Sequence, residues 1–223
     1  MIEHFIERNI LRRLMLNETL HFSQLKAKDM ESNLFMYHLN SLVRKGYISK
    51  TNDGYSLAPL GLHYVDSLSN VNLKPREQPK IITILAITNN HDQWLLAERQ
   101  SQPYIHQLMF PSGKQHLGEL MIDHAKREAE EKIGLKLSLK YRGLAEVAIF
   151  SDKILLSHII GYVYFAKRNI KLPNASERFH YLWFNFSSDS DKLMPGTFRL
   201  YQELQKGKPN FLISLKYNLS SPT

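Results

Sequence analysis

The chain has 223 residues, of which 43% are hydrophobic and 22% charged, so it is long enough for one large or two small globular domains. It contains no cysteine, which excludes disulfides, cysteine–zinc sites and thiol chemistry. The formal net charge of +8 favours a nucleic-acid partner, but residues 1–69 carry eight basic against seven acidic side chains, so this charge is spread along the chain.

The first residues, MIEHFIERNILRRLM, are charged throughout and predict neither a secretory signal nor a transit peptide. No run of about 18 apolar residues is present to span a membrane. We therefore expect a cytoplasmic protein with no membrane partner.

The N-terminal part predicts a series of short helices. Apolar residues at helical spacing predict a first helix over residues 3–16, and residues 22–30 contain a short second helix with Ser23 as its N-cap. A third helix is predicted over residues 31–45. Its apolar stripe consists of Leu34, His38 or Leu39, Leu42 and Val43.

A hairpin and a fourth helix follow. Gly46 is expected to end the third helix, because glycine easily adopts a positive φ. Two β-prone runs then flank Asn52-Asp53-Gly54, which is typical of a tight hairpin. Residues 59–69 return to a helical pattern. Helix, helix, helix, hairpin and helix is the order of a winged helix-turn-helix domain.

The run HLNSLVRKGYISKTNDGYSLAPLG resembles the recognition helix and wing of bacterial winged-helix regulators. That resemblance implies that the helix over residues 31–45 enters the major groove of double-stranded DNA. The implied base readers are Asn33, Tyr37, His38, Asn40 and Ser41, and the implied phosphate contacts are Arg44, Lys45 and Lys50. The alternative is an interaction or dimerisation module, because Asp29 and Glu31 at the start of this helix would repel phosphates.

The segment SNVNLKPREQPK, residues 69–80, has two prolines, Pro75 and Pro79, and no periodic apolar pattern, so it predicts a linker. We expect a domain over residues 1–69, a linker over residues 70–80 and a second domain over residues 81–223.

The second domain contains the most specific motif of the chain. Residues Gly113 to Leu135 match the pattern G-x5-E-x7-R-E-U-x-E-E-x-G-U, where U is apolar, at every defined position except Lys132, which stands in place of a glutamate. The stretch resembles the Nudix family, whose members hydrolyse nucleoside diphosphates linked to another group. The resemblance covers about residues 81–206 and implies an α/β/α sandwich, which makes the whole chain α+β.

The remaining elements agree with such a sandwich. Two apolar strands are predicted over residues 81–87 and 93–98, two more at 141–150 and 155–166, and a last one around Trp183, followed by a helix near 196–206. The strand over residues 155–166 is almost continuously apolar, so we expect it to be central.

Helical spacing predicts the faces of the motif helix, which we expect over residues 119–133. One apolar stripe should pack on the sheet: Ile122, Ala125, Ala129 and Ile133. The polar strip beside it consists of His124, Glu128, Glu131 and Lys132. Glu128 and Glu131 are three residues apart, so their carboxylates should project together and form a site for Mg²⁺ or Mn²⁺. The alternative is a solvated helix face on which Glu128 pairs with Lys132.

The resemblance also implies individual roles. Gly113 would let the loop backbone approach the metal or phosphate, and Glu119 would pair with Arg127 to brace this loop. Glu128 and Glu131 would bind the metal, and one of them would serve as base. We expect Gly113, Lys114 and Lys132 to contact the ligand. Because Lys132 replaces a negative ligand with a positive group, it should weaken metal binding and catalysis.

A few residues have two possible interpretations. His124 is either a packed histidine or an additional ligand or base, and Glu177 is a candidate base from a later loop. Trp183, Tyr104 and Phe110 are either core residues or surfaces on which a nucleobase stacks.

The sequence therefore predicts a Nudix-type hydrolase of a nucleoside-diphosphate-type ligand, with activity weakened by Lys132. The alternative is a winged-helix transcriptional regulator whose Nudix-like domain senses a nucleotide or nucleotide sugar without turnover. Since winged-helix modules and Nudix-like domains commonly pair, we expect a homodimer in either case.

Overall fold

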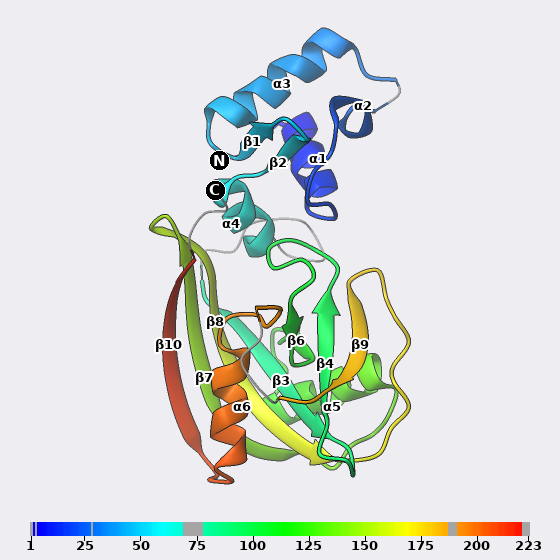
Figure 1. Ribbon diagram of the computed structural model, residues 1–223, viewed down its shortest axis with the longest axis vertical. Coiled ribbons are helices and arrows are strands. Elements are labelled where there is room, and N and C mark those ends of the chain that lie inside the picture. Colours follow the sequence, from blue (N-terminus) through cyan, green and yellow to red (C-terminus); the bar gives the residue numbers. More distant parts are fainter. Residues whose placement is uncertain (1, 3, 28, 69–77, 187–190, 220–223) are drawn as a thin grey trace.

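The computed structural model describes residues 2, 4–27, 29–68, 78–186 and 191–219, apart from the side chain of Ser67. A group of short helices lies at one end of the molecule and a large sheet at the other (Figure 1). Most of the predicted linker, residues 70–77 with Pro75, lies outside the described residues. None of the described helices is long and apolar enough to cross a membrane.

The N-terminal elements follow the predicted order. They are α1 (Phe5–Leu14), α2 (Phe22–Leu25), α3 (Ser32–Arg44), β1 (Ile48–Thr51), β2 (Gly54–Leu57) and α4 (Pro59–Ser67). The two strands pair antiparallel, and α3 is followed after Lys45 by Gly46, whose φ of 76° is the left-handed conformation that glycine favours. Apolar side chains from all four helices form one core.

Two local predictions in this part are wrong. In the stripe of α3, Leu39 and Leu42 are buried as predicted and Val43 packs against the same core, whereas Leu34 is 47% exposed and Phe35 is buried in its place. The short helix α2 begins after His21, not Ser23. Its first turn is closed by the Gln24 side chain, whose Oε1 accepts from the His21 N–H at 2.7 Å.

The C-terminal sheet has eight strands in the order β10–β7–β8–β3–β4–β5, with β6 paired to β3 and β9 paired to β4. Strand β8 lies between β7 and β3, which agrees with its predicted central place. The bounds are β3 (Lys80–Thr88), β4 (Trp94–Arg99), β5 (Leu108–Met109), β6 (Ser112–Lys114), β7 (Lys140–Ser151), β8 (Ile154–Lys167), β9 (Phe179–Phe184) and β10 (Phe211–Leu219).

Strand β10 is absent from the predicted elements. It pairs in parallel with β7 at an edge of the sheet, with Phe211 opposite Gly143. A signal for it was present, since apolar residues occupy every second position from Phe211 to Leu219.

The two faces of the sheet are covered by α5 (Met121–Ile133) and α6 (Thr197–Gln205). Because side chains alternate along a strand, Ile82 and Ile84 of β3 pack in the core that contains Leu200 of α6, whereas Leu85 and Ile87 pack in the core that contains Ala125 of α5. The second domain is therefore an α/β/α sandwich. Figure 1 shows α6 in front of the sheet and α5 behind it.

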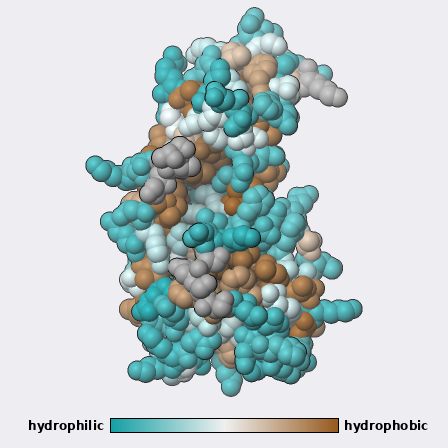
Figure 2. Space-filling model, in the orientation of Figure 1, coloured by the Kyte–Doolittle hydropathy of each residue, from teal (hydrophilic) through white to brown (hydrophobic). Residues whose placement is uncertain are grey.

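The two ends of the molecule meet through α4. Its Asp66 accepts from the hydroxyl of Ser157 on β8 at 2.9 Å and forms an ion pair with Lys80 on β3. A loop contact adds to this, because the N–H of Gln102 donates to the carbonyl of Met15 at 2.8 Å. On the face shown in Figure 2, hydrophobic residues lie among hydrophilic ones near the middle of the molecule.

Candidate functional site

The candidate site is built on α5 and the loop before it. The helix begins at Met121, two residues later than predicted, and Ile122 is 38% exposed, so it does not belong to the buried stripe. Ala125, Ala129 and Ile133 do pack on the sheet. Burying these three residues fixes the rotation of the helix and turns its carboxylates and Arg127 toward the loop.

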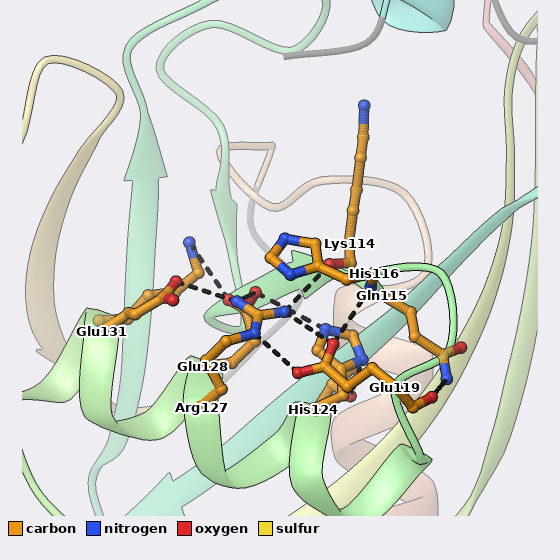
Figure 3. A network of polar contacts seen from close by, with 10 residues as sticks. Lys114, Gln115, His116, Glu119, His124, Arg127, Glu128 and Glu131 are labelled. Atoms are coloured by element: carbon orange, nitrogen blue, oxygen red, sulfur yellow. Dashed lines mark hydrogen bonds and ion pairs between the residues drawn. The ribbon is translucent and has the colours of Figure 1, made fainter. Parts of the chain in front are cut away.

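Arg127 is the centre of the polar network (Figure 3). Its Nε and Nη2 donate to the two carboxylate oxygens of Glu119 at 2.8 and 3.1 Å. Its Nη1 donates to both Glu128 Oε1 and Glu131 Oε2, each at 3.0 Å. One guanidinium therefore binds three carboxylates, and the predicted pair of Glu119 and Arg127 is part of a larger cluster. These hydrogen bonds, that with Glu119 first, raise the pKa of Arg127 further.

Glu128 is the buried carboxylate of the cluster, with 4% of the residue exposed. Burial raises its pKa, but the neighbouring His124 ring and the charges of Lys132 and Arg127 outweigh this, so its pKa lies below the ordinary value. The Lys132 Nζ lies 3.5 Å from Oε2, and His124 Nε2 lies 3.6 Å from Oε1. Glu128 is thus held as an anion by neighbouring donors and cations.

His124 is fully buried, with its Nδ1 2.8 Å from the hydroxyl of Thr83 on β3. It joins Thr83 to Glu128 underneath the network. This position corresponds to the packed alternative for His124.

Gly113 lies on β6, opposite Thr83 of β3. A Cβ built on Gly113 would lie 1.8 Å from the carboxyl carbon of Glu128, which is far inside van der Waals contact. Only glycine lets the loop backbone approach this carboxylate so closely. The sequence predicts that the backbone at Gly113 approaches a metal or phosphate, and in the structure it approaches the carboxylate of Glu128.

The bracing pair gives an expected pH dependence. The hydrogen bond with Arg127 is the largest cause that lowers the pKa of Glu119, from 4.5 to about 2. A carboxyl whose pKa is depressed in the folded state contributes stability that is complete above the unfolded pKa and is lost as pH falls through the folded pKa. We expect the melting temperature of the native chain to fall between pH 4.5 and about 2 more steeply than that of Glu119→Gln.

Calorimetric melting curves over this pH range measure the difference. Asp123→Asn is a matched control, because Asp123 is an exposed acidic residue of the same helix whose nearest cation, Lys126, lies 3.6 Å away. Parallel pH profiles for the native chain and Glu119→Gln would contradict the bracing role.

As arranged, these residues do not fit a divalent cation. A hard-cation site needs several oxygen ligands around one point. Arg127 lies between the carboxylates of Glu128 and Glu131, and the ammonium of Lys132 faces the second oxygen of Glu128. Among the described ranges, acidic, histidine and cysteine side chains form no group of three that could hold a metal. The carboxylates of Glu128 and Glu131 do project together as predicted, but they bind the guanidinium of Arg127.

A cavity of about 330 Å³ opens beside this network. Six lysine or arginine side chains and three acidic ones line it, so its walls carry an excess of positive charge. The cations are Lys80, Arg99, Lys114, Arg127, Lys132 and Arg178, and the acids are Asp66, Glu128 and Glu131. Figure 3 shows the side chain of Lys114 extending away from the α5 network.

Several residues that line the cavity are not among the site residues predicted from the sequence. Lys80, Arg99, Arg178 and Asp66 come from four separate segments, so no spacing rule links them. Burial lowers the pKa of Arg99, and its Nε has no hydrogen-bond partner among the described residues.

The predicted candidates for base stacking and for a later general base lie in three kinds of place: the cavity, the core and the surface. Tyr104 is buried, lines the cavity and has a pKa raised by burial. Phe110 packs edge-on against Trp94 in the α6-side core, and Trp183 packs against the α5-side core. Glu177 is exposed and does not line the cavity.

The predicted DNA contacts on α3 and in the segment after it are only partly on the surface. His38 and Ser41 are buried at 7% and 6% exposure, so their prediction as base readers is wrong. They lie beside the buried Glu7, whose Oε1 is 3.6 Å from His38 Nδ1 and 3.2 Å from Lys45 Nζ. The residues that remain exposed are Asn33, Tyr37, Asn40, Arg44, Lys45 and Lys50.

Comparison with known protein families shows that residues 78–204 match the NUDIX domain. A mutator MutT protein from Bacillus halodurans has a similar structure, with 19% identity, a TM-score of 0.52, and coverage of 62% of this chain and 90% of that one. A MutT NUDIX hydrolase from Burkholderia pseudomallei is 24% identical, with a TM-score of 0.48 and coverage of 57% and 99%.

The NUDIX domain of Shewanella oneidensis NrtR, solved with ADP ribose, is 13% identical, with a TM-score of 0.47 and coverage of 61% and 94%. No curated protein matches the chain. At these identities, the likeness to the B. halodurans protein shows the fold.

Proposed function

Because the chain belongs to the NUDIX domain family, we propose that its cavity binds a nucleoside diphosphate linked to another group and hydrolyses it slowly. The observation that carries this proposal is the surplus of cations on the cavity walls, with six lysines and arginines against three acidic residues. A diphosphate is a multiply charged anion, and charge-assisted hydrogen bonds from lysine and arginine are the strong contacts available to it.

The residues of the motif have distinct parts in this binding. Lys114 and Lys132 both line the cavity and offer ammonium groups to phosphate oxygens. Arg127 donates its N–H groups to Glu119, Glu128, Glu131 and the carbonyl of Lys114, so it orders the network beside the cavity and leaves the ligand to the two lysines. Gly113 keeps the loop backbone against Glu128, which fixes the position of Lys114 next to it.

Hydrolysis is limited by Lys132 in this proposal. Glu128 and Glu131 match the family's metal ligands, and a Mg²⁺ or Mn²⁺ held there would supply charge neutralisation of the diphosphate and an activated water, but Arg127 lies between the two carboxylates in the present arrangement. The Lys132 ammonium at 3.5 Å from Glu128 opposes a second cation at that carboxylate. Lys132 therefore supports ligand binding while it weakens turnover.

A substrate panel tests the proposal. The native chain and Lys132→Glu are incubated with Mg²⁺ or Mn²⁺ and with ADP-ribose, dinucleoside polyphosphates, nucleoside triphosphates or sugar nucleotides, and both binding and product are measured. Failure of the native chain to bind any member of the panel would refute the proposal.

The second candidate function is a transcriptional regulator, in which the first 69 residues form a winged-helix DNA-binding domain and the Nudix domain senses the ligand. The feature that favours it is the exposed polar face of α3, which carries Asn33, Tyr37 and Arg44. Glu31 stands at the start of this helix, but its carboxylate accepts from the N–H groups of Asn33 and Leu34 at 2.8 and 2.7 Å and so acts as the helix cap. We propose a homodimer for either of the two functions.

DNA binding gives a quantitative expectation for this candidate. The chain should bind its own upstream DNA more tightly than random DNA, and Arg44→Ala should weaken binding to both and reduce the salt slope by about 1, as for a lost phosphate contact. Arg12→Ala, on the exposed side of α1, is the control. Equal affinity for upstream and random DNA at all salt concentrations would count against the regulator.

A further inference from the structure

The end of α4 reaches the cavity and engages two of its lysines. The carboxylate of Asp66 pairs with Lys80 and accepts from the hydroxyl of Ser157 at 2.9 Å. Two residues later, the backbone carbonyl of Leu68 accepts from the Nζ of Lys114 at 3.2 Å. Asp66, Leu68, Lys80, Lys114 and Ser157 all line the cavity.

These contacts are well shielded from water. The side chains of Asp66 and Lys80 are 9% and 13% exposed, and Ser157 is buried. Charges that are partly removed from water interact more strongly than surface pairs. The carbonyls at the end of a helix also carry the negative end of the helix dipole. The end of α4 therefore presents a carboxylate and partial negative charge to cations of the ligand cavity.

An anionic ligand presents the same chemistry. A phosphate group offers oxygens that accept from two ammonium groups and a hydroxyl, which are the donors that Lys80, Lys114 and Ser157 now direct at Asp66 and the carbonyl of Leu68. Asp66 and a phosphate cannot occupy one set of donors together, because two anions at contact distance repel.

We propose that Lys80, Lys114 and Ser157 form a binding position for a phosphate group of the ligand, which the end of α4 occupies in the present structure. Ligand and α4 compete for this position, so ligand binding releases α4 from β8. The inference rests on the proposed function, and it links occupancy of the cavity to the N-terminal helices.

Pyrophosphate titration tests the competition. Inorganic pyrophosphate is the probe, and isothermal titration calorimetry measures its affinity for the full chain and for Asp66→Asn, which keeps the size of the side chain and removes its charge. We expect Asp66→Asn to bind pyrophosphate about tenfold more tightly, because a competing anion has been removed. Asp123→Asn, which removes an acidic charge outside the cavity, should bind as the native chain does.

A distance measurement tests the release of α4 without altering Asp66. The chain has no cysteine, so Ser32→Cys on α3 and Lys136→Cys after α5 take spin labels without a competing thiol. Both positions are exposed. Pyrophosphate should lengthen or broaden the distance distribution between the labels in the doubly labelled chain.

The outcomes separate this inference from the proposed function. Pyrophosphate binding of equal affinity to the native chain and Asp66→Asn, with unchanged label distances, would overturn the competition and leave ligand binding intact. Absence of pyrophosphate binding in all variants would overturn both. Tighter binding by Asp66→Asn together with a ligand-dependent change in distance would establish the competition.

Discussion

Lys132→Glu is expected to create a divalent-cation site and to raise hydrolysis. The substitution exchanges an ammonium 3.5 Å from Glu128 for a third carboxylate on the same face of α5, beside Glu128 and Glu131. One unit charge at 4 Å is worth about 4 kcal/mol at an effective dielectric near 20, and the exchange changes the local charge by two units. After strong screening, we expect Mg²⁺ affinity to rise by about 2 kcal/mol or more, roughly 30-fold.

Calorimetric titration with Mg²⁺ and Mn²⁺ measures the affinity, and turnover of the best-bound panel nucleotide measures the rate. Lys136→Glu makes the same charge change at an exposed position beyond the helix and should alter neither. Lys132→Gln removes the ammonium without adding a ligand, so its metal affinity should lie between those of the native chain and Lys132→Glu.

Three outcomes have different meanings for the protein. Turnover that appears only in Lys132→Glu would mean that the native domain binds its ligand without hydrolysing it, as the regulator requires. Turnover by the native chain that Lys132→Glu does not raise would show that Lys132 does not limit catalysis. Metal affinity that is unchanged in Lys132→Glu would contradict the electrostatic argument itself.

Arg127→Gln is expected to destabilise the Nudix domain more than any exposed substitution on α5. The guanidinium binds Glu119, Glu128 and Glu131, and Glu128 is only 5% exposed at its side chain. Removing the partner of a buried charge leaves that charge uncompensated, which costs about 3–5 kcal/mol in a fully buried pair. Because Arg127 is 23% exposed and Lys132 still faces Glu128, we expect the free energy of unfolding to fall by about 2–4 kcal/mol.

Thermal unfolding measures this loss as a fall in melting temperature of roughly 5–15 °C for a domain of this size. The control is Lys126→Gln, the neighbouring basic residue, whose side chain is 59% exposed and pairs with Asp123 at 3.6 Å. That variant should change stability by less than about 0.5 kcal/mol. Arg127→Lys keeps the charge but has three donors instead of five and no fork for the two hydrogen bonds to Glu119, so its melting temperature should lie between those of Arg127→Gln and the native chain.

The spacing of residues along α5 predicted much of the site. The family resemblance implied the pairing of Glu119 with Arg127 and the close approach of Gly113, and helical spacing along α5 placed Glu128 and Glu131 near each other. The same rule placed Lys132 beside Glu128, where the structure has it. Strand β8 and the order of the N-terminal elements were also predictable, because apolar periodicity and turn residues are local properties of the chain.

Errors arose where burial depends on a distant partner. His38 and Ser41 have the polarity of surface residues, but Glu7 on α1 provides them with a buried polar neighbour. Ile122 has the right spacing for the apolar stripe, yet it lies in the first turn of α5 and is 38% exposed. The spacing of residues within α3 or α5 does not show where another helix or strand packs against that helix.

The sequence by itself determined the family, the face of α5 and the presence of a cation at position 132, because these depend on residues close together in the chain. Only the tertiary structure decided that Arg127 gathers three carboxylates and that Lys80, Arg99 and Arg178 line one cavity with them. It also brought Asp66 of α4 to β3 and β8, across 14 and 91 residues of chain. Such contacts follow from the packing of whole elements, which fixes distances that residue spacing leaves open.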